Sequence, residues 1–125
     1  MPTSRTMLGD WGEDAAGKFL ERRGYQILDR KYRCQWGEID LVARDGDCLV
    51  FVEVRTRRSK LFGTPQESLT EAKAGRLVAV CQDYLEKRVD EKSRGETVWR
   101  IDLVSVHPSR GRAPRIEHLR HAVEL

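Results

Sequence analysis

Apolar side chains recur along this chain with two periods, one typical of helices and the other typical of strands. Residues 8–23 and 68–88 repeat apolar positions at helical spacing, and Gly24 follows the first segment, so both are predicted to be amphipathic helices. Ser68 and Glu71 have capping-box spacing, which predicts that the second helix begins near Ser68. Shorter apolar runs predict strands over residues 25–33, 38–43, 48–56 and 98–106.

The order of these elements predicts an α/β domain. Helix, three strands, helix and strand favour a central mixed β-sheet flanked by helices, and 125 residues suit a single domain over residues 1–125. Asp45 and Gly46 predict a tight hairpin turn, because an Asp-Gly pair accommodates positive φ angles. Residues 107–114 are rich in proline, glycine and arginine and predict a loop, followed by a short extra strand or an irregular tail.

The predicted strand 48–56 carries charged residues on a face that its pattern predicts to be buried. Glu53 and Arg55 are two positions apart, so both side chains share the face of Phe51. Ionised groups are costly to bury without partners. The strand therefore needs a reason for displaying a carboxylate and a guanidinium together.

The hairpin places a second carboxylate on the same side of the sheet. With residues 45–46 as the turn, Asp40 pairs with Phe51 and Glu38 pairs with Glu53. Asp40 and Glu53 then become diagonal neighbours, about 7 Å apart at the backbone. At that separation, their carboxylates are expected to share one divalent cation.

Each predicted helix carries one charge on the face it is expected to bury. Glu13 falls in line with Leu20, and Lys73 falls in line with Val80, at helical spacings. If these residues converge on Asp40 and the charged strand, the set suits metal-assisted phosphodiester hydrolysis, in which carboxylates hold Mg²⁺ or Mn²⁺. A structural ion-pair network is the alternative explanation.

The distribution of positive charge favours a phosphate-bearing partner. The net charge is only +3, from 23 basic and 20 acidic residues. A basic cluster nevertheless follows the charged strand, and such clusters are typical of phosphate binding, although many are simply solvated surface. Trp36 lies close to the acids and is a candidate for stacking on a base, with packing as the alternative. The cluster consists of Arg55, Arg57, Arg58 and Lys60.

Cysteine usage and hydropathy favour the cytoplasm. The three cysteines are widely spaced without a CxxC pair, which argues against a disulfide framework or a zinc knuckle. The sequence has no apolar run near the length of a membrane span, and its start lacks the apolar segment of a signal peptide. His118 and His121 lack a ligand frame and are expected to be ordinary surface histidines.

Three segments of the chain carry a resemblance to a known family. "GEDAAGKFLERRGYQIL", "GEIDLVARDGDCLVFVEVRTR" and "FGTPQESLTEAKAGRL" resemble the YraN-like family of small bacterial proteins, over roughly residues 9–106. That family is similar to the Holliday-junction resolvases of the restriction-endonuclease-like, or PD-(D/E)xK, superfamily. The resemblance implies a metal-dependent, structure-selective endonuclease acting on branched DNA. It is also compatible with a homodimer, because a junction presents two equivalent strands.

The resemblance assigns roles to individual residues. Asp40 resembles the aspartate metal ligand, Glu53 the acid of the (D/E)xK half-motif, and Glu13 the helix glutamate of the resolvase-like branch. Arg55 stands where the family pattern has lysine, and arginine cannot act as a base because its pKa is too high. Lys73 is then the candidate for a titratable amine in the same site.

Three functions remain open from the sequence. The first is the metal-dependent endonuclease. The second is a nucleic-acid-binding module on a nuclease fold without turnover, because Arg55 replaces the lysine. The third is a cytoplasmic adaptor in which the charges are structural. Gln66 is a further candidate for orienting phosphate or water, with a loop or capping role as its alternative.

Overall fold

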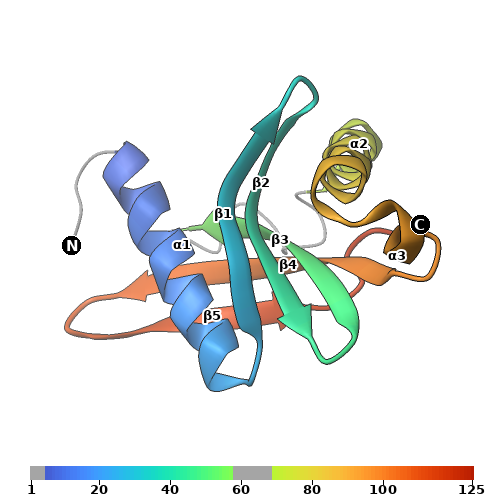
Figure 1. Ribbon diagram of the computed structural model, residues 1–125. Helices are drawn as coiled ribbons and strands as arrows, with labels where there is room; N and C mark the ends of the chain where they lie inside the picture. Colours follow the sequence, from blue (N-terminus) through green and yellow to red (C-terminus); the bar gives the residue numbers. More distant parts are fainter. Residues whose placement is uncertain (1–4, 58–68) are drawn as a thin grey trace.

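The computed structural model describes residues 5–57 and 69–125, and these form a five-stranded sheet flanked by helices (Figure 1). Arg58, Lys60, Gln66 and Ser68 lie outside the described residues. Among the described residues, no helix has the length and apolar character needed to cross a membrane. The elements are α1 (Arg5–Arg22), β1 (Gln26–Cys34), β2 (Gly37–Asp45), β3 (Cys48–Thr56), α2 (Glu71–Arg88), α3 (Glu91–Arg94), β4 (Val98–Ser109) and β5 (Arg112–Leu119).

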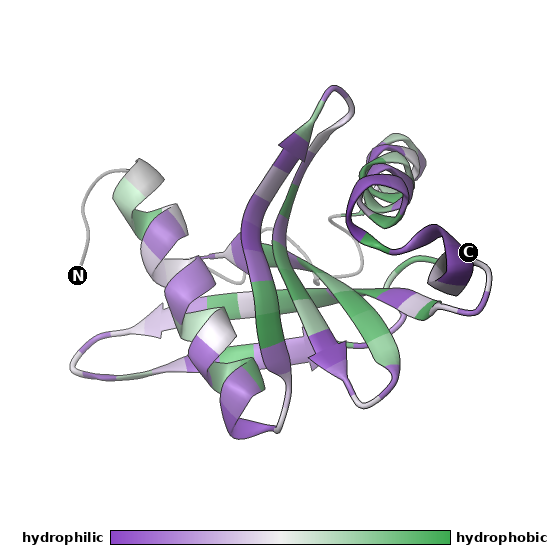
Figure 2. Ribbon diagram, viewed as in Figure 1, coloured by the Kyte–Doolittle hydropathy of each residue, from purple (hydrophilic) through white to green (hydrophobic). Residues whose placement is uncertain are grey.

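The sheet is mixed, as the sequence predicts. Its strands lie in the order β1-β2-β3-β4-β5, with β3 and β4 parallel and all other neighbours antiparallel. Parallel neighbours need a crossover connection, and α2 lies in the segment that joins β3 to β4. The central parallel strands are largely apolar (Figure 2), but Glu53 on β3 and Arg100, Asp102 and Ser105 on β4 are polar and buried.

β3 divides the core into two clusters, one on each face of the sheet. Val50 and Val52 pack with Ala16 and Leu20 of α1. Phe51 and Leu49 point the other way and pack with Leu77 and Val80 of α2. This alternation explains why residues 48–52 of β3 are all apolar, since a strand covered on both faces has no solvated side.

α1 approaches the end of β3 through a glycine. A Cβ atom at Gly12 would lie 1.8 Å from Thr56 Oγ1, so only glycine permits this approach without a shift. The contact brings the next residue, Glu13, to the end of the sheet. Gly24, with φ of 90°, follows the helix as predicted.

The start of α2 differs from its prediction. The helix begins at Glu71, and the side chain of Thr70 accepts a hydrogen bond from Lys73 N at 3.2 Å. Thr70 therefore caps the helix in the position expected for Ser68.

The predicted loop 107–114 is also wrong, because most of it is strand. β4 continues to Ser109, Gly111 with φ of 66° lies in a tight turn, and β5 returns along β4. Pro114 is compatible with this strand because β5 is at the sheet edge, where a missing backbone N–H is tolerated.

The β2–β3 register is shifted by two residues from the predicted one. Asp45 pairs with Cys48, so Gly46 and Asp47 form the turn, with φ of 58° at Gly46. A shift of two residues leaves each side chain on its predicted face. Continued past the last pair, this register places Asp40 directly across from Glu53 rather than diagonal to it.

Candidate functional site

Asp40 lies at the point where β2 and β3 separate. The last paired residues of these strands are Leu41 and Val52. Beyond them, Asp40 Oδ2 accepts a hydrogen bond from Val54 N at 2.7 Å, so the side chain replaces a backbone partner. This bond fixes the carboxylate at the fork between the strands.

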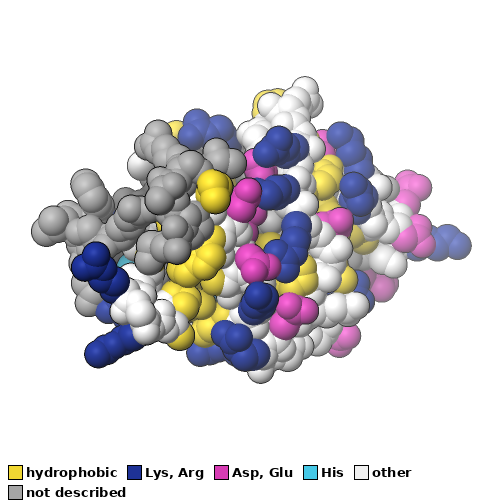
Figure 3. All heavy atoms as spheres, turned by 90° about the vertical axis from the view of Figure 1, so that its left-hand side faces the viewer, with side chains coloured by type: hydrophobic (Ala, Val, Ile, Leu, Met, Phe, Trp, Pro, Cys, Tyr) yellow, Lys and Arg dark blue, Asp and Glu magenta, His cyan; other side chains and the backbone are white. Residues whose placement is uncertain are grey.

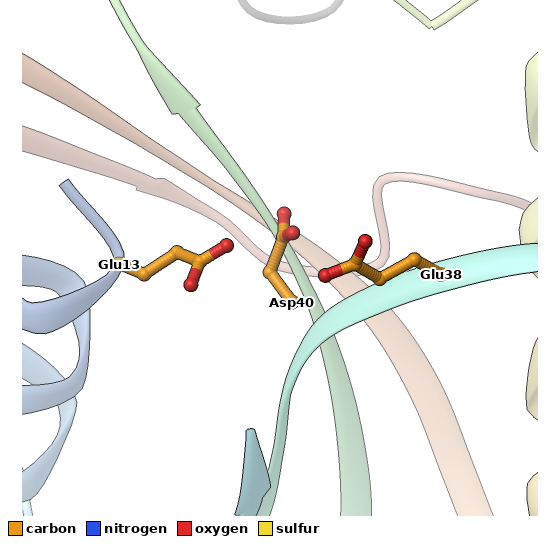
Figure 4. Close-up of side chains that lie close together, drawn as sticks. All are labelled: Glu13, Glu38 and Asp40. Atoms are coloured by element: carbon orange, nitrogen blue, oxygen red, sulfur yellow. The ribbon is translucent and has the colours of Figure 1, made fainter. Parts of the chain in front are cut away.

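Three carboxylates converge at this fork. One oxygen from each of Glu13, Glu38 and Asp40 lies within 4.8 Å of the others. Glu13 approaches from α1, whereas Glu38 and Asp40 project from β2, and all three point toward a common region (Figure 4). Oxygen ligands from two rigid elements suit a hard cation such as Mg²⁺ or Mn²⁺.

Glu53 lies beside this acid trio but has cationic partners. Its Oε1 is 3.5 Å from an Arg55 guanidinium nitrogen and 3.7 Å from Lys73 Nζ, and the residue is 7% exposed. The structure therefore brings all five predicted catalytic residues to one region. Within it, Glu38 rather than Glu53 completes the three-carboxylate group. The signal for Glu38 in the sequence is its position two residues before Asp40, on the same strand face.

The electrostatics of the site disfavour ionised acids. Burial raises the pKa of Asp40, and repulsion from Glu53 and Glu13 raises it further, against the opposing effect of the Val54 hydrogen bond. Burial also raises the pKa of Glu53; Arg55 opposes this, and the nearby Glu38 and Glu13 add to it. A bound divalent cation would remove this penalty by favouring the charged forms.

The sequence patterns did not predict Lys31, which forms an ion pair with Glu13. Lys31 Nζ is 2.8 Å from Glu13 Oε2 and 2.8 Å from Asp10 Oδ1. These hydrogen bonds raise the pKa of Lys31, which keeps its amine charged. Lys31 also has a positive φ of 53°, uncommon for a residue with a side chain. Its contacts come from residues 21 and 18 positions away, which no local pattern predicts.

A hollow of about 270 Å³ opens over Asp40 and Glu53. Trp36, in the turn between β1 and β2, is 52% exposed at its edge. A larger hollow of about 570 Å³ at the other end of α2 contains none of the acid trio. We call the smaller one the acid pocket; it is lined by Trp36, Gly37, Glu38, Asp40, Glu53, Lys73, Arg76, Leu77 and Val80.

The predicted basic cluster is described only in part. Arg55 lies in the site, and Arg57 continues the line of β3, with its backbone N–H donating to Val106 O at 2.9 Å. Elsewhere, cations and acids are interspersed: one face of the molecule shows both kinds of side chain among apolar ones (Figure 3). Lys18, for example, is 3.2 Å from Asp14 along α1. On that face, no single sign of charge dominates.

A second buried acid, Asp102 on β4, belongs to a different kind of cluster. Its oxygens accept hydrogen bonds from Arg100 Nε at 2.9 Å and His121 N at 3.2 Å, and lie 2.8 Å from His118 Nε2. Burial alone would raise the pKa of Asp102, but the His118 and Arg100 interactions outweigh it and lower the pKa. The prediction of a surface histidine is wrong for His118, whose side chain is 3% exposed.

Comparisons with known proteins identify the family. The pattern described as "Uncharacterised protein family UPF0102" matches residues 12–106. A UPF0102 protein of Roseiflexus castenholzii is 52% identical, covering 99% of this chain and 98% of the relative. Another, from Pelotomaculum thermopropionicum, is 43% identical, with coverage of 98% and 99%.

Among solved structures, the chain is similar to one described as "The structure of Pyrococcus Furiosus SfsA in complex with Ca2+". The TM-score is 0.40 at 13% identity, covering 96% of this chain and 65% of that one. A likeness at this level assigns neither fold family nor function. The sequence relatives do decide the family, and they confirm the YraN-like resemblance: the chain belongs to the UPF0102 family.

Proposed function

We propose that this protein is a metal-dependent, structure-selective DNA endonuclease with a restriction-endonuclease-like fold. The observation that supports the proposal is the convergence of Glu13, Glu38 and Asp40 from two elements on one point. Burial and the neighbouring charges of Glu53 and Glu13 raise the pKa of Asp40, so its ionised form is costly unless a cation is bound. In this proposal the ion is Mg²⁺ or Mn²⁺, and Glu53 is a further ligand or an orienting acid.

The bound cation would polarise the phosphoryl oxygen and lower the pKa of an attacking water. Arg55 and Lys73 would bind the phosphate and stabilise the negative charge that grows in the transition state. Both already lie within 4 Å of Glu53, and Lys73 also lines the acid pocket. Among the described residues, Arg55 Nε has no hydrogen-bond partner although it is buried, so it has a donor to offer to a phosphate oxygen.

The second candidate function follows from the permanent positive charge of Arg55. Arginine remains protonated, so Arg55 can bind phosphate but cannot remove a proton from water. Lys73 Nζ, 3.7 Å from Glu53, is the amine placed to do so in this pocket. If Lys73 does not take this part, the protein would be a nucleic-acid-binding module without turnover. The observation that favours this alternative is the arginine itself.

Calorimetric binding of Mn²⁺ to the wild type and to Asp40→Asn tests the metal site. We expect binding by the wild type and its loss in Asp40→Asn. Asp47→Asn is the matched control, because it makes the same chemical change at an exposed turn outside the site. Absence of Mn²⁺ binding by the wild type, even with DNA present, would remove the proposed mechanism.

Cleavage of branched, flapped and linear DNA, with Mg²⁺, Mn²⁺ or chelator, tests turnover. We expect metal-dependent cleavage of branched substrates that Asp40→Asn lacks and Asp47→Asn retains. Equal cleavage by the wild type and Asp40→Asn would indicate a contaminant and refute the nuclease. Binding without cleavage, with turnover gained in Arg55→Lys, would instead support the second candidate.

A further inference from the structure

The acid pocket has an exposed aromatic side chain at its entrance. Trp36 lines the pocket together with Glu38 and Asp40, yet 52% of its surface remains accessible. Among the described residues, the other exposed large hydrophobic side chains are Met7, Val98 and Leu125, and none of these lines the pocket. Trp11 and Trp99 differ, because both are half-buried against the core clusters.

The turn that carries Trp36 is held against α2. A Cβ atom at Gly37 would lie 3.7 Å from Val80 Cγ2, so the residue after Trp36 is in contact range of the helix. Arg76 lies one helical turn before Val80 and lines the same pocket, as does Lys73. The pocket thus has an indole ring from the hairpin turn and two cations from α2.

Arg76 differs from the other cations around the acids. Lys31, Arg55 and Lys73 each lie within 4 Å of a carboxylate of Glu13 or Glu53. In the part of the chain that the structure describes, Arg76 is exposed and forms no ion pair. Its charge is therefore available to an anionic ligand.

An aromatic ring, a cation without an acid partner and a group of carboxylates together suit a nucleotide. The phosphate would meet the cations, and the base would stack on the indole, an interaction that all four bases can make. A base inside a duplex is stacked on both sides and presents only its edges to a protein. A base that stacks on Trp36 must therefore be unpaired.

We infer that Trp36 and Arg76 bind an unpaired nucleotide next to the scissile phosphate, so that the substrate has a single-stranded segment at the cut. This inference rests on the proposed function, because it names the kind of DNA that the acid pocket accepts. Trp36 would stack on the base, and Arg76 would bind the neighbouring phosphate. Neither residue takes part in the metal site.

Binding assays without divalent cations separate this inference from catalysis. Fluorescence anisotropy would compare a labelled single strand, a flapped duplex and a fully paired duplex of the same sequence. We expect Trp36→Ala to weaken binding to the single strand and the flap roughly tenfold, the loss typical of one stacked base, and to leave duplex binding unchanged. Trp36→Phe should retain most of the affinity, and Val98→Ala controls for the loss of an exposed apolar side chain.

Removing the base instead of the ring gives the complementary test. A flap with one abasic nucleotide at the junction should lower wild-type affinity as much as Trp36→Ala does, and should cause no further loss in Trp36→Ala, because the two changes remove one contact. Arg76→Ala should weaken binding of all single-stranded probes and reduce its salt dependence. Equal losses on flap and duplex, or equal affinities for abasic and intact flaps, would overturn the inference.

The two proposals fail in different ways. Metal-dependent cleavage that is indifferent to Trp36 and to the abasic site would overturn the stacking role and leave the nuclease intact. A base-dependent effect of Trp36 without any cleavage would support the nucleotide site while refuting the nuclease.

Discussion

Asp40 and Asp102 are carboxylates held within the same sheet in opposite electrostatic surroundings. Asp102 interacts with Arg100 and His118 at 2.9 and 2.8 Å, and its pKa is lowered. Asp40 accepts one hydrogen bond from Val54 N, has acids as its neighbours, and its pKa is raised. The cations at that site lie on its edges, where Lys31 contacts Glu13.

The difference is the one expected between a structural charge cluster and a binding site. A buried carboxylate whose oxygens already interact with cations and hydrogen-bond donors has its charge balanced within the fold, so it does not need a bound ion. Carboxylates that repel one another persist only if the fold around them is stable enough to hold them, and such groups concentrate at functional sites. If the two clusters differ in this way, the same substitution should have different effects in each of them.

The largest expected effect is the loss of the Asp102 charge. Asp102→Asn leaves the buried Arg100 without its closest carboxylate, and breaking a buried ion pair costs roughly 3–5 kcal/mol in the free energy of unfolding. Urea unfolding would measure this cost. The same change at Asp40 should leave stability unchanged or raise it, because it removes a repelled charge. Similar destabilisation by both substitutions would mean that the clusters do not differ.

Metal affinity, unlike stability, should fall when the Asp40 charge is removed. Asp40→Asn should reduce Mn²⁺ affinity by at least about 10- to 100-fold, the loss that changes outside the ligand shell already cause. Asn can still accept the Val54 hydrogen bond through its oxygen, but it then turns an NH₂ group toward the acids. Calorimetry measures the loss, and undiminished affinity in Asp40→Asn would exclude Asp40 as a ligand.

The contact between Gly12 and Thr56 should control the position of Glu13. Gly12→Ala forces Cβ into Thr56 Oγ1, at a cost of about 1–3 kcal/mol for overpacking, and should also weaken Mn²⁺ binding. Gly9→Ala is the matched control in the same helix, because nothing lies within 4 Å of its Cβ position. Thermal unfolding and calorimetry measure the two effects.

A rescue variant distinguishes a local clash from a general loss of helix packing. Thr56→Ala removes the Oγ1 and Cγ2 atoms that the new Cβ meets. Adding it to Gly12→Ala should restore part of both the stability and the Mn²⁺ affinity. If Gly12→Ala lost stability but kept full Mn²⁺ affinity, Glu13 would not depend on this contact.

The smallest effect is on the pH dependence of stability. Because the pKa values of Asp40 and Glu53 are raised in the folded protein, the folded state binds more protons, and the free energy of unfolding falls as pH rises from the ordinary carboxyl pKa through the raised ones. Asp102 acts oppositely: its contribution is lost as pH falls through its lowered pKa.

Urea unfolding in chelator across this pH range would measure the slope. Asp40→Asn should reduce the fall toward higher pH, and Asp47→Asn should not. Mn²⁺ at a hundred times its dissociation constant should stabilise the wild type by about 2.7 kcal/mol. At a fixed Mn²⁺ concentration, this stabilisation should be larger at higher pH. Identical slopes in the wild type and Asp40→Asn would refute the raised pKa of Asp40.

Local patterns predicted the strands and the faces of the site residues. β3 has the predicted bounds, and Asp40, Glu53 and Arg55 came from its period-two pattern and that of β2. The turn was misplaced because Asp45-Gly46 and Gly46-Asp47 are both good turn formers. This error in the strand register did not move the site residues to the other face of the sheet, because the shift was two residues and not one.

Features set by distant contacts could not be read from the chain. The face of Glu38 follows from its spacing to Asp40, but the separation of β2 from β3 at residues before Leu41, where the acid trio gathers, leaves no local signal. The interaction of His118 with Asp102 joins two strands, and Tyr25, just before β1, accepts a further hydrogen bond from Arg100. Such clusters depend on the completed fold.

The hydrogen bond between Asp40 and Val54 also restricts how Asp40 can coordinate an ion. Oδ2 accepts a hydrogen bond from the backbone of β3, which makes Oδ1 the less engaged oxygen and favours monodentate coordination by Asp40 over bidentate coordination. The remaining protein oxygens would then come from Glu13 and Glu38, with water and phosphate completing the shell. A site with few protein ligands and several exchangeable positions is typical of Mg²⁺, which retains waters, rather than of a cage that encloses Ca²⁺.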